Sequence, residues 1–119
     1  MKEISYGIVP YIFTKKGTKI LLALSSKKSS WGFIKGKIEA QDDDKFQTIE
    51  REVFEEIGIK IKKDIELFFI NFQEILTSQK FNIDFNEIYK IKFFHIKKIP
   101  DINKNQRLLI TNILNRFKF

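Results

Sequence analysis

Cysteine is absent from this chain of 119 residues, and histidine occurs only once, at His95. Without cysteine there is no disulfide framework, no thiol nucleophile and no cysteine-ligated zinc. A single histidine excludes a multi-histidine metal site, and because His95 lies in the strand-like run IKFFHIKK we expect it to be structural. The apolar runs are too short or too interrupted to span a membrane. We therefore expect a soluble, cytoplasmic protein with one domain over residues 1–119 and no membrane partner.

Acidic residues are in the minority, and about half of them are gathered in one segment. The chain has 22 Lys and Arg against 15 Asp and Glu, a net charge of +7, yet residues 42–56 hold seven acids and two bases. The rest of the chain therefore holds 20 bases and eight acids. Such a surface would attract nucleotides or RNA. Lysine is frequent throughout the sequence, however, so the charge alone leaves the partner open.

The hydrophobic pattern predicts a mixed α/β domain with helices packed on a sheet. In chain order we expect a hairpin of strands at 5–14 and 18–25, a loop at 25–37, a helix at 43–57, strands at 65–76 and 86–98, and a helix at 103–119. Pro10 suggests an edge strand or a bulge, and Gly58 is a typical helix terminator. One face of the last helix carries the residues Leu109, Ile110, Ile113, Leu114 and Phe117.

Three glutamates share one side of the central helix. At ~100° per residue, Glu52, Glu55 and Glu56 fall within an arc of roughly 100°, beside the apolar stripe that contains Val53. Arg51 precedes Glu55 by four residues and can brace it. Magnesium and manganese prefer such oxygen ligands. The alternative is a solvated acidic face, which also explains a helix rich in glutamate.

The segment REVFEEIGI, residues 51–59, matches the pattern R-E-U-x-E-E-x-G-U, where U is a bulky aliphatic residue. With Gly36 and the acids that precede the helix, it resembles the Nudix signature, G-x5-E-x7-R-E-U-x-E-E-x-G-U. The resemblance implies a Nudix-type α/β/α sandwich, in which helices flank a mixed sheet. It also implies that water attacks a phosphorus of a nucleoside diphosphate linked to another group. By position, Glu52, Glu55, Glu56 and the Gly36 carbonyl would bind Mg²⁺ or Mn²⁺, and Arg51 would orient the glutamates.

Two positions depart from that signature. Gly36 and Arg51 are fifteen residues apart where the signature has fourteen, so one residue is inserted. The first acid of the signature is then Asp42 or Asp43, where glutamate is usual. Ile34 also stands where proline often precedes the Lys-Gly pair. We expect the loop before the helix to absorb the inserted residue.

Two further blocks bear on the substrate. WGFIKGKI, residues 31–38, resembles the W-G-F-P-K-G-K-I run of mRNA-decapping enzymes of the Nudix family. NEIYKIKFFHIKKIP, residues 86–100, resembles their N-E-I-x-x-I-x-W-F-x-I-x-x-L-P block. The resemblance implies a capped RNA substrate. Family members often draw one more acid from beyond the helix, and among Glu74, Asp84 and Glu87 the position in this block favours Glu87 as metal ligand or general base.

Side chains near these blocks are candidates for substrate binding. Lys35 and Lys37 would contact phosphates, unless they are simply solvated. Trp31 or Phe33 would stack on a base or pack at the sheet edge, with packing the preferred interpretation. The tyrosines are expected to pack, namely Tyr6, Tyr11 and Tyr89.

Other functions remain open at this point. Decapping enzymes generally carry a helical regulatory domain before the Nudix domain, and 119 residues leave no room for one, so a decapping cofactor protein is a candidate partner. A dinucleoside polyphosphate or another small nucleotide is the alternative substrate. The domain could also have lost catalysis and serve as a nucleotide sensor or interaction module. Monomer and homodimer are both compatible with the sequence.

Overall fold

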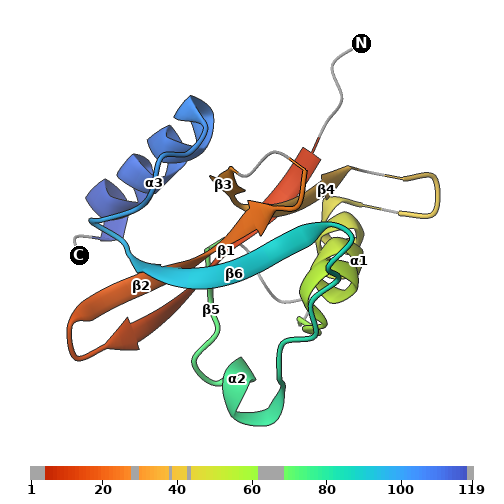
Figure 1. The fold of residues 1–119 in the computed structure, drawn as a ribbon, viewed down its shortest axis with the longest axis horizontal. Helices are drawn as coiled ribbons and strands as arrows, with labels where there is room; N and C mark the ends of the chain where they lie inside the picture. Colours follow the sequence, from red (N-terminus) through yellow and green to blue (C-terminus); the bar gives the residue numbers. More distant parts are fainter. Residues whose placement is uncertain (1–4, 28–29, 38, 43, 62–68, 118–119) are drawn as a thin grey trace.

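The computed structural model describes residues 5–27, 30–37, 39–42, 44–61 and 69–117. Its elements are β1 (Ser5–Thr14), β2 (Gly17–Ser25), β3 (Trp31–Gly32), β4 (Ile34–Lys37), α1 (Lys45–Ile57), β5 (Phe69–Asn71), α2 (Ile75–Ser78), β6 (Ile88–His95) and α3 (Lys104–Phe117). A sheet lies between α1 on one side and α3 on the other (Figure 1). Within these ranges no helix is long and apolar enough to cross a bilayer.

The sheet is mixed, as predicted. Its main order is β3-β2-β1-β4, and β6 pairs with β2 antiparallel while β5 pairs with β1 parallel. The predicted hairpin is confirmed, because Thr14 pairs with Gly17 across the turn and Gly17 has a φ of 120°, which glycine adopts without steric cost. From the sequence, Pro10 indicates an edge strand or a bulge. The edge strand is wrong, since β1 pairs with three strands. Pro10 lies between the stretch that pairs with β4 and the stretch that pairs with β2.

Alternation along the strands divides the core into two layers. In β2, Leu21 and Ala23 pack toward α1, whereas the intervening Ile20 and Leu22 pack toward α3. From the helices, Val53 and Ile57 of α1 complete the first layer and Ile110 and Ile113 of α3 complete the second. The sheet therefore buries both faces, which confirms the predicted sandwich.

Two segments differ from their predicted structure. The predicted loop at 25–37 contains β3, which pairs with β2, and β4, which pairs with β1, so tertiary pairing overrides its polar, glycine-containing composition. Of the predicted strand at 65–76, residues 62–68 lie outside the described ranges and only Phe69–Asn71 is a strand. The Asn71 side chain accepts a hydrogen bond from the Gln73 N–H at 2.8 Å, which turns the chain into the single helical turn of α2.

Both main helices form where the sequence predicts them. Helix α1 is capped by Asp44, whose side chain accepts from the Gln47 N–H, and it ends at Gly58, which has a φ of 73°. The predicted start at 43 was therefore two residues early. Leu109 of α3 was expected on the packed face but is 40% exposed, whereas Ile110 is buried. The side chain of Phe117 lies outside the described part of the structure.

Candidate functional site

Helix α1 carries its three glutamates at different depths. Val53 and Ile57 are buried against the sheet, which fixes the rotation of the helix. The Glu52 side chain is 15% exposed and the Glu55 side chain 57%. Glu56 is partly buried. The acidic arc therefore borders the buried stripe, as its spacing predicted.

A buried ion pair joins this helix to the preceding loop. Asp42 accepts hydrogen bonds from Arg51 Nε at 3.2 Å and Nη2 at 2.9 Å, and its side chain is only 3% exposed. The Thr48 hydroxyl and the Glu39 N–H also donate to Asp42, both at 2.9 Å. Hydrogen bonding to Arg51 lowers the pKa of Asp42 well below its usual range, and the same bond raises the pKa of Arg51. Asp42 therefore takes the place of the first signature acid, while Asp43 lies outside the described residues.

The Arg51 guanidinium also contacts Glu52 and Glu55. Arg51 Nη1 donates to Glu52 Oε1 at 2.7 Å and lies 3.5 Å from Glu55 Oε2. A Cβ atom at position 36 would overlap Cγ and Cδ of Glu52. The backbone of β4 at Gly36 therefore lies directly against the Glu52 side chain. The extra residue between Gly36 and Arg51 therefore does not separate Gly36 from Glu52, because the connection from β4 to α1 absorbs it.

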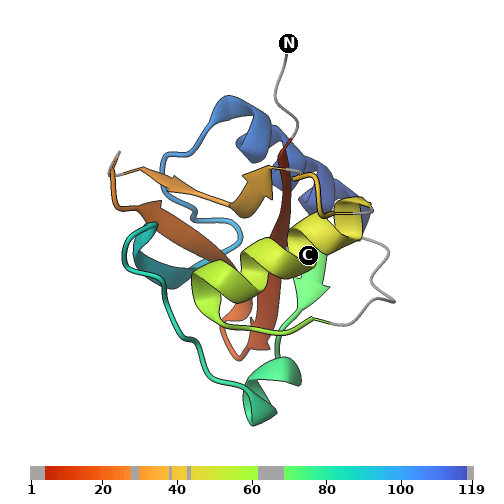
Figure 2. The same cartoon turned by 90° about the vertical axis from the view of Figure 1, so that its right-hand side faces the viewer.

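Carboxylates from two parts of the chain converge on Glu56. Burial, together with the negative charges of Glu52, Glu87, Glu55 and Asp84, raises the pKa of Glu56 to about 8. A backbone hydrogen bond of 2.9 Å from the Asp84 N–H to the Glu56 carbonyl joins the two segments. Figure 2 shows the end of α1 beside the chain that leads into β6. The negative charges around Glu56 therefore favour a cation beside it.

A tight turn positions the two acids that precede β6. The Asp84 carbonyl accepts from the Glu87 N–H at 3.0 Å, and the Asp84 side chain accepts from the Asn86 N–H at 3.0 Å. The Ser26 N–H and hydroxyl donate to the Glu87 and Asn86 carbonyls, which ties the turn to the end of β2. Of the three acids considered from the sequence, Asp84 and Glu87 thus lie near Glu56. Glu74 precedes α2 and is not among the charges that act on Glu56.

The chemistry of this group of acids fits a divalent cation, because hard cations prefer carboxylate and carbonyl oxygens. In the described ranges no three His, Cys, Asp or Glu side chains already lie in an arrangement that could hold a metal ion. Glu52 is held by Arg51, and Glu55 is turned toward solvent. The metal-binding roles of Glu52, Glu55, Glu56 and Gly36 therefore remain predictions.

Trp31 is packed rather than free to stack. Its ring meets the Phe94 ring edge-on at 4.8 Å, and Lys90 Nζ lies 5.6 Å from its centre. Phe33 likewise packs in the layer under α3. Tyr11 stacks on Phe69 with ring centres 4.0 Å apart, as expected of a packing tyrosine. The side chain of Tyr6 is outside what the structure describes.

Lys35 of β4 does not lie with the acids. Ile34 packs toward α1, and Gly36 meets Glu52 on the same side of β4. By alternation, the exposed Lys35 lies on the opposite face. The side chain of Lys37 is not described, so phosphate binding by Lys35 or Lys37 remains a prediction.

Two aromatic residues close to the acids in sequence are exposed, which was not predicted. Phe85 is 71% exposed and Tyr89 is 65% exposed, on either side of Glu87. The expectation that Tyr89 packs is therefore wrong, because none of the described residues covers its ring. The position of Phe85 within the polar run DFNE is a sequence signal that favours an exposed ring.

Comparison with known proteins identifies the chain. The family model described as NUDIX domain matches residues 2–111. This protein belongs to the Nudix family. A sequence comparison with curated proteins gives no significant match.

Solved Nudix structures share the fold at low sequence identity. The NUDIX domain of Shewanella oneidensis NrtR, solved with ADP ribose, is 15% identical, with a TM-score of 0.73 over 98% of this chain and 89% of that one. A C. elegans Ap4A hydrolase is 19% identical, with a TM-score of 0.71 over 99% and 100% of the two chains. An ADP-ribose pyrophosphatase from Streptococcus suis is 16% identical, with a TM-score of 0.63 over 98% and 93%. At these identities the comparison establishes the fold alone.

Proposed function

We propose that this Nudix protein is a metal-dependent pyrophosphohydrolase that acts on a nucleotide-containing substrate. The observation that carries the proposal is that the charges of Glu52, Glu55, Asp84 and Glu87 all act on the partly buried Glu56. Acids crowded in this way repel each other, and a divalent cation relieves that repulsion. A solvated acidic face would not need the Asp42 ion pair that anchors the base of the helix.

In this proposal Glu52, Glu55, Glu56 and the Gly36 carbonyl hold Mg²⁺ or Mn²⁺. When bound, such a cation offsets charge on phosphoryl oxygens and acidifies a coordinated water. Arg51 keeps Glu52 oriented through their 2.7 Å contact. Glu87 accepts the proton of the attacking water, whose oxygen bonds to phosphorus as the bond to the leaving phosphate breaks. Phe85, exposed beside Glu87, offers its ring to the substrate base.

Capped RNA is the first substrate that we propose, with release of the cap as a capped nucleoside diphosphate. The support is the pair of sequence blocks that resemble decapping enzymes. These blocks contact each other in the fold, since Trp31 of the first packs on Phe94 of the second and under Lys90. We further propose a cytoplasmic location and activation by a decapping cofactor protein.

A dinucleoside polyphosphate is the second substrate that we propose. The C. elegans Ap4A hydrolase covers the same length of chain, 99% of one and 100% of the other, which favours a core of this size acting on a small nucleotide. A catalytically lapsed sensor is a weaker candidate, because all three helix glutamates are present.

The deciding experiment compares capped RNA, a dinucleoside polyphosphate and ADP-ribose as substrates, each with Mg²⁺ and with Mn²⁺. We expect Glu56→Gln to lower turnover by orders of magnitude. The matched control is Glu50→Gln, which makes the same change at an exposed position of α1 and should retain parent activity. Equal turnover of parent and Glu56→Gln would refute the proposed site. Tight binding without turnover of any substrate would favour the sensor.

A further inference from the structure

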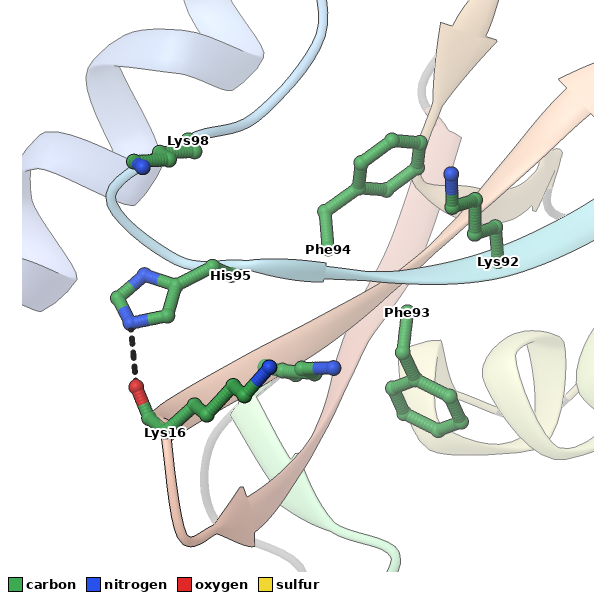
Figure 3. A pocket seen from close by; sticks show the side chains of 7 residues that line it. Lys16, Lys92, Phe93, Phe94, His95 and Lys98 are labelled. Carbon is green, nitrogen blue, oxygen red and sulfur yellow. Dashed lines mark hydrogen bonds between the residues drawn. The ribbon is translucent and has the colours of Figure 1, made fainter.

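A second concentration of charge lies at the opposite end of β6 from the acids. There the chain forms a pocket of about 490 Å³, shown in Figure 3, and most of its lining is basic or aromatic. The lining residues include Lys16, Lys19, Lys92, Lys98, Phe93 and Phe94. No aspartate or glutamate is among them. Four lysines and no acid in the lining give this pocket a positive potential that attracts anions.

His95 fixes the shape of this pocket. Its Nδ1 accepts a hydrogen bond from the Lys97 N–H at 3.2 Å, so the proton is on Nε2, which donates to the Lys16 carbonyl at 2.9 Å. A Cβ at Gly17 would lie 2.6 Å from the same Nε2, so the turn between β1 and β2 lies close against the imidazole. His95 therefore has the structural role expected from the sequence, and it holds the lysines of the turn beside those of β6.

Lys90 extends the basic surface of the pocket along β6. Lys90 and Lys92 are two residues apart on β6 and so face the same side of the sheet. Each lies over an aromatic ring, Lys90 at 5.6 Å from Trp31 and Lys92 at 5.2 Å from Phe94. The five residues from Glu87 to Lys92, where the pocket lining begins, span about 17 Å at about 3.3 Å each. Both lysines lie on the α3 side of the sheet with Phe94, so a phosphate chain bound there follows β6 from the Glu87 turn to the pocket.

We propose that the pocket and the Lys90–Lys92 face of β6 bind the phosphodiester backbone of single-stranded RNA. Proteins that bind single strands without sequence preference combine a basic groove with aromatic side chains, and both are present here. The inference rests on the proposed function with capped RNA, because it supplies a place for the strand beyond the cap.

The test measures binding without catalysis. A fluorescent, uncapped single-stranded RNA is titrated with protein in EDTA at several salt concentrations, and anisotropy gives the association constant. For single strands, the logarithm of that constant falls with the logarithm of salt by about 0.7 for each phosphate neutralised. The double variant Lys92→Ala/Lys98→Ala should therefore reduce the slope by about 1.4 and weaken binding at low salt.

The matched control is Lys45→Ala/Lys60→Ala, which removes the same charge from exposed positions at the two ends of α1. We expect its slope to equal that of the parent. Equal slopes for the two double variants would overturn the proposal, as would displacement of the RNA by tripolyphosphate at the same phosphate concentration. Unchanged circular dichroism melting of both variants establishes that the lysines act on binding and not on folding. Because this assay contains neither a divalent cation nor a cap, it measures this site alone. If the RNA bound as expected but capped RNA, the dinucleoside polyphosphate and ADP-ribose were not hydrolysed with Mg²⁺ or Mn²⁺, the proposed function would be refuted and this site would stand.

Discussion

Glutamine in place of Glu56 should make the metal-free protein more stable at neutral and alkaline pH. In the folded protein the pKa of Glu56 is about 8 against an ordinary value of 4.5. Below pH 4.5 both the folded and the unfolded chain hold this proton, so it has no effect. Between pH 4.5 and 8 only the folded chain holds it, so the free energy of unfolding falls as pH rises. Above pH 8 the full destabilisation is present.

The size of the effect follows from the pKa values. At about 1.4 kcal/mol per pH unit, the full difference would be at most about 5 kcal/mol. Since Glu56 is only partly buried and water screens its charge, we expect about 2 kcal/mol. Asp42 acts in a different range, because its pKa is lowered and its contribution is lost only as pH falls below the ordinary range of aspartate.

Urea denaturation in EDTA at pH 5, 6, 7 and 8 measures this difference. The parent should lose stability across the series, while Glu56→Gln should lose less. The same substitution at the exposed Glu50 should follow the parent. Parallel profiles for parent and Glu56→Gln would show that the acids do not converge on Glu56. Added Mg²⁺ should stabilise the parent more than Glu56→Gln at pH 8, because a ligand of the folded state raises its stability.

Three other substitutions test the surroundings of Glu56. Gly36→Ala should lower kcat at least about tenfold, because the added Cβ would displace the Glu52 side chain. The control is Gly32→Ala, which should retain activity in the same assay because its Cβ meets only the end of the Gln106 side chain. Asp42→Asn should lower the melting temperature at pH 7 and lower it less at pH 3, since the ion pair with Arg51 needs the charged carboxylate. Equal losses of melting temperature at pH 7 and pH 3 would contradict this. Phe85→Ala should raise KM about 10-fold or more, from loss of stacking, with kcat and melting temperature unchanged; an unchanged KM would exclude Phe85 from the substrate site.

The sequence predicted the parts of the site that lie within one element. The spacing of Glu52, Glu55 and Glu56 and the Gly58 terminator follow from helical geometry, so α1 and its acidic edge could be placed from the residues alone. The Nudix signature supplied Gly36 and Arg51 by position. The insertion before Arg51 left the first acid open between Asp42 and Asp43, and only the hydrogen bonds to Arg51 identify Asp42 in that role.

Contacts between distant segments were decided by the tertiary structure. Burial of Phe85 and Tyr89 depends on whether another element covers them, which no local pattern determines, and no element among the described residues does. The polar segment before β4 forms strands only because β1 and β2 offer backbone partners. The basic pocket likewise brings the β1–β2 turn against residues about eighty positions later. A short stretch of sequence determines which residues share a helix face. The charges around Glu56 and around His95, by contrast, come from chain segments that meet only on folding.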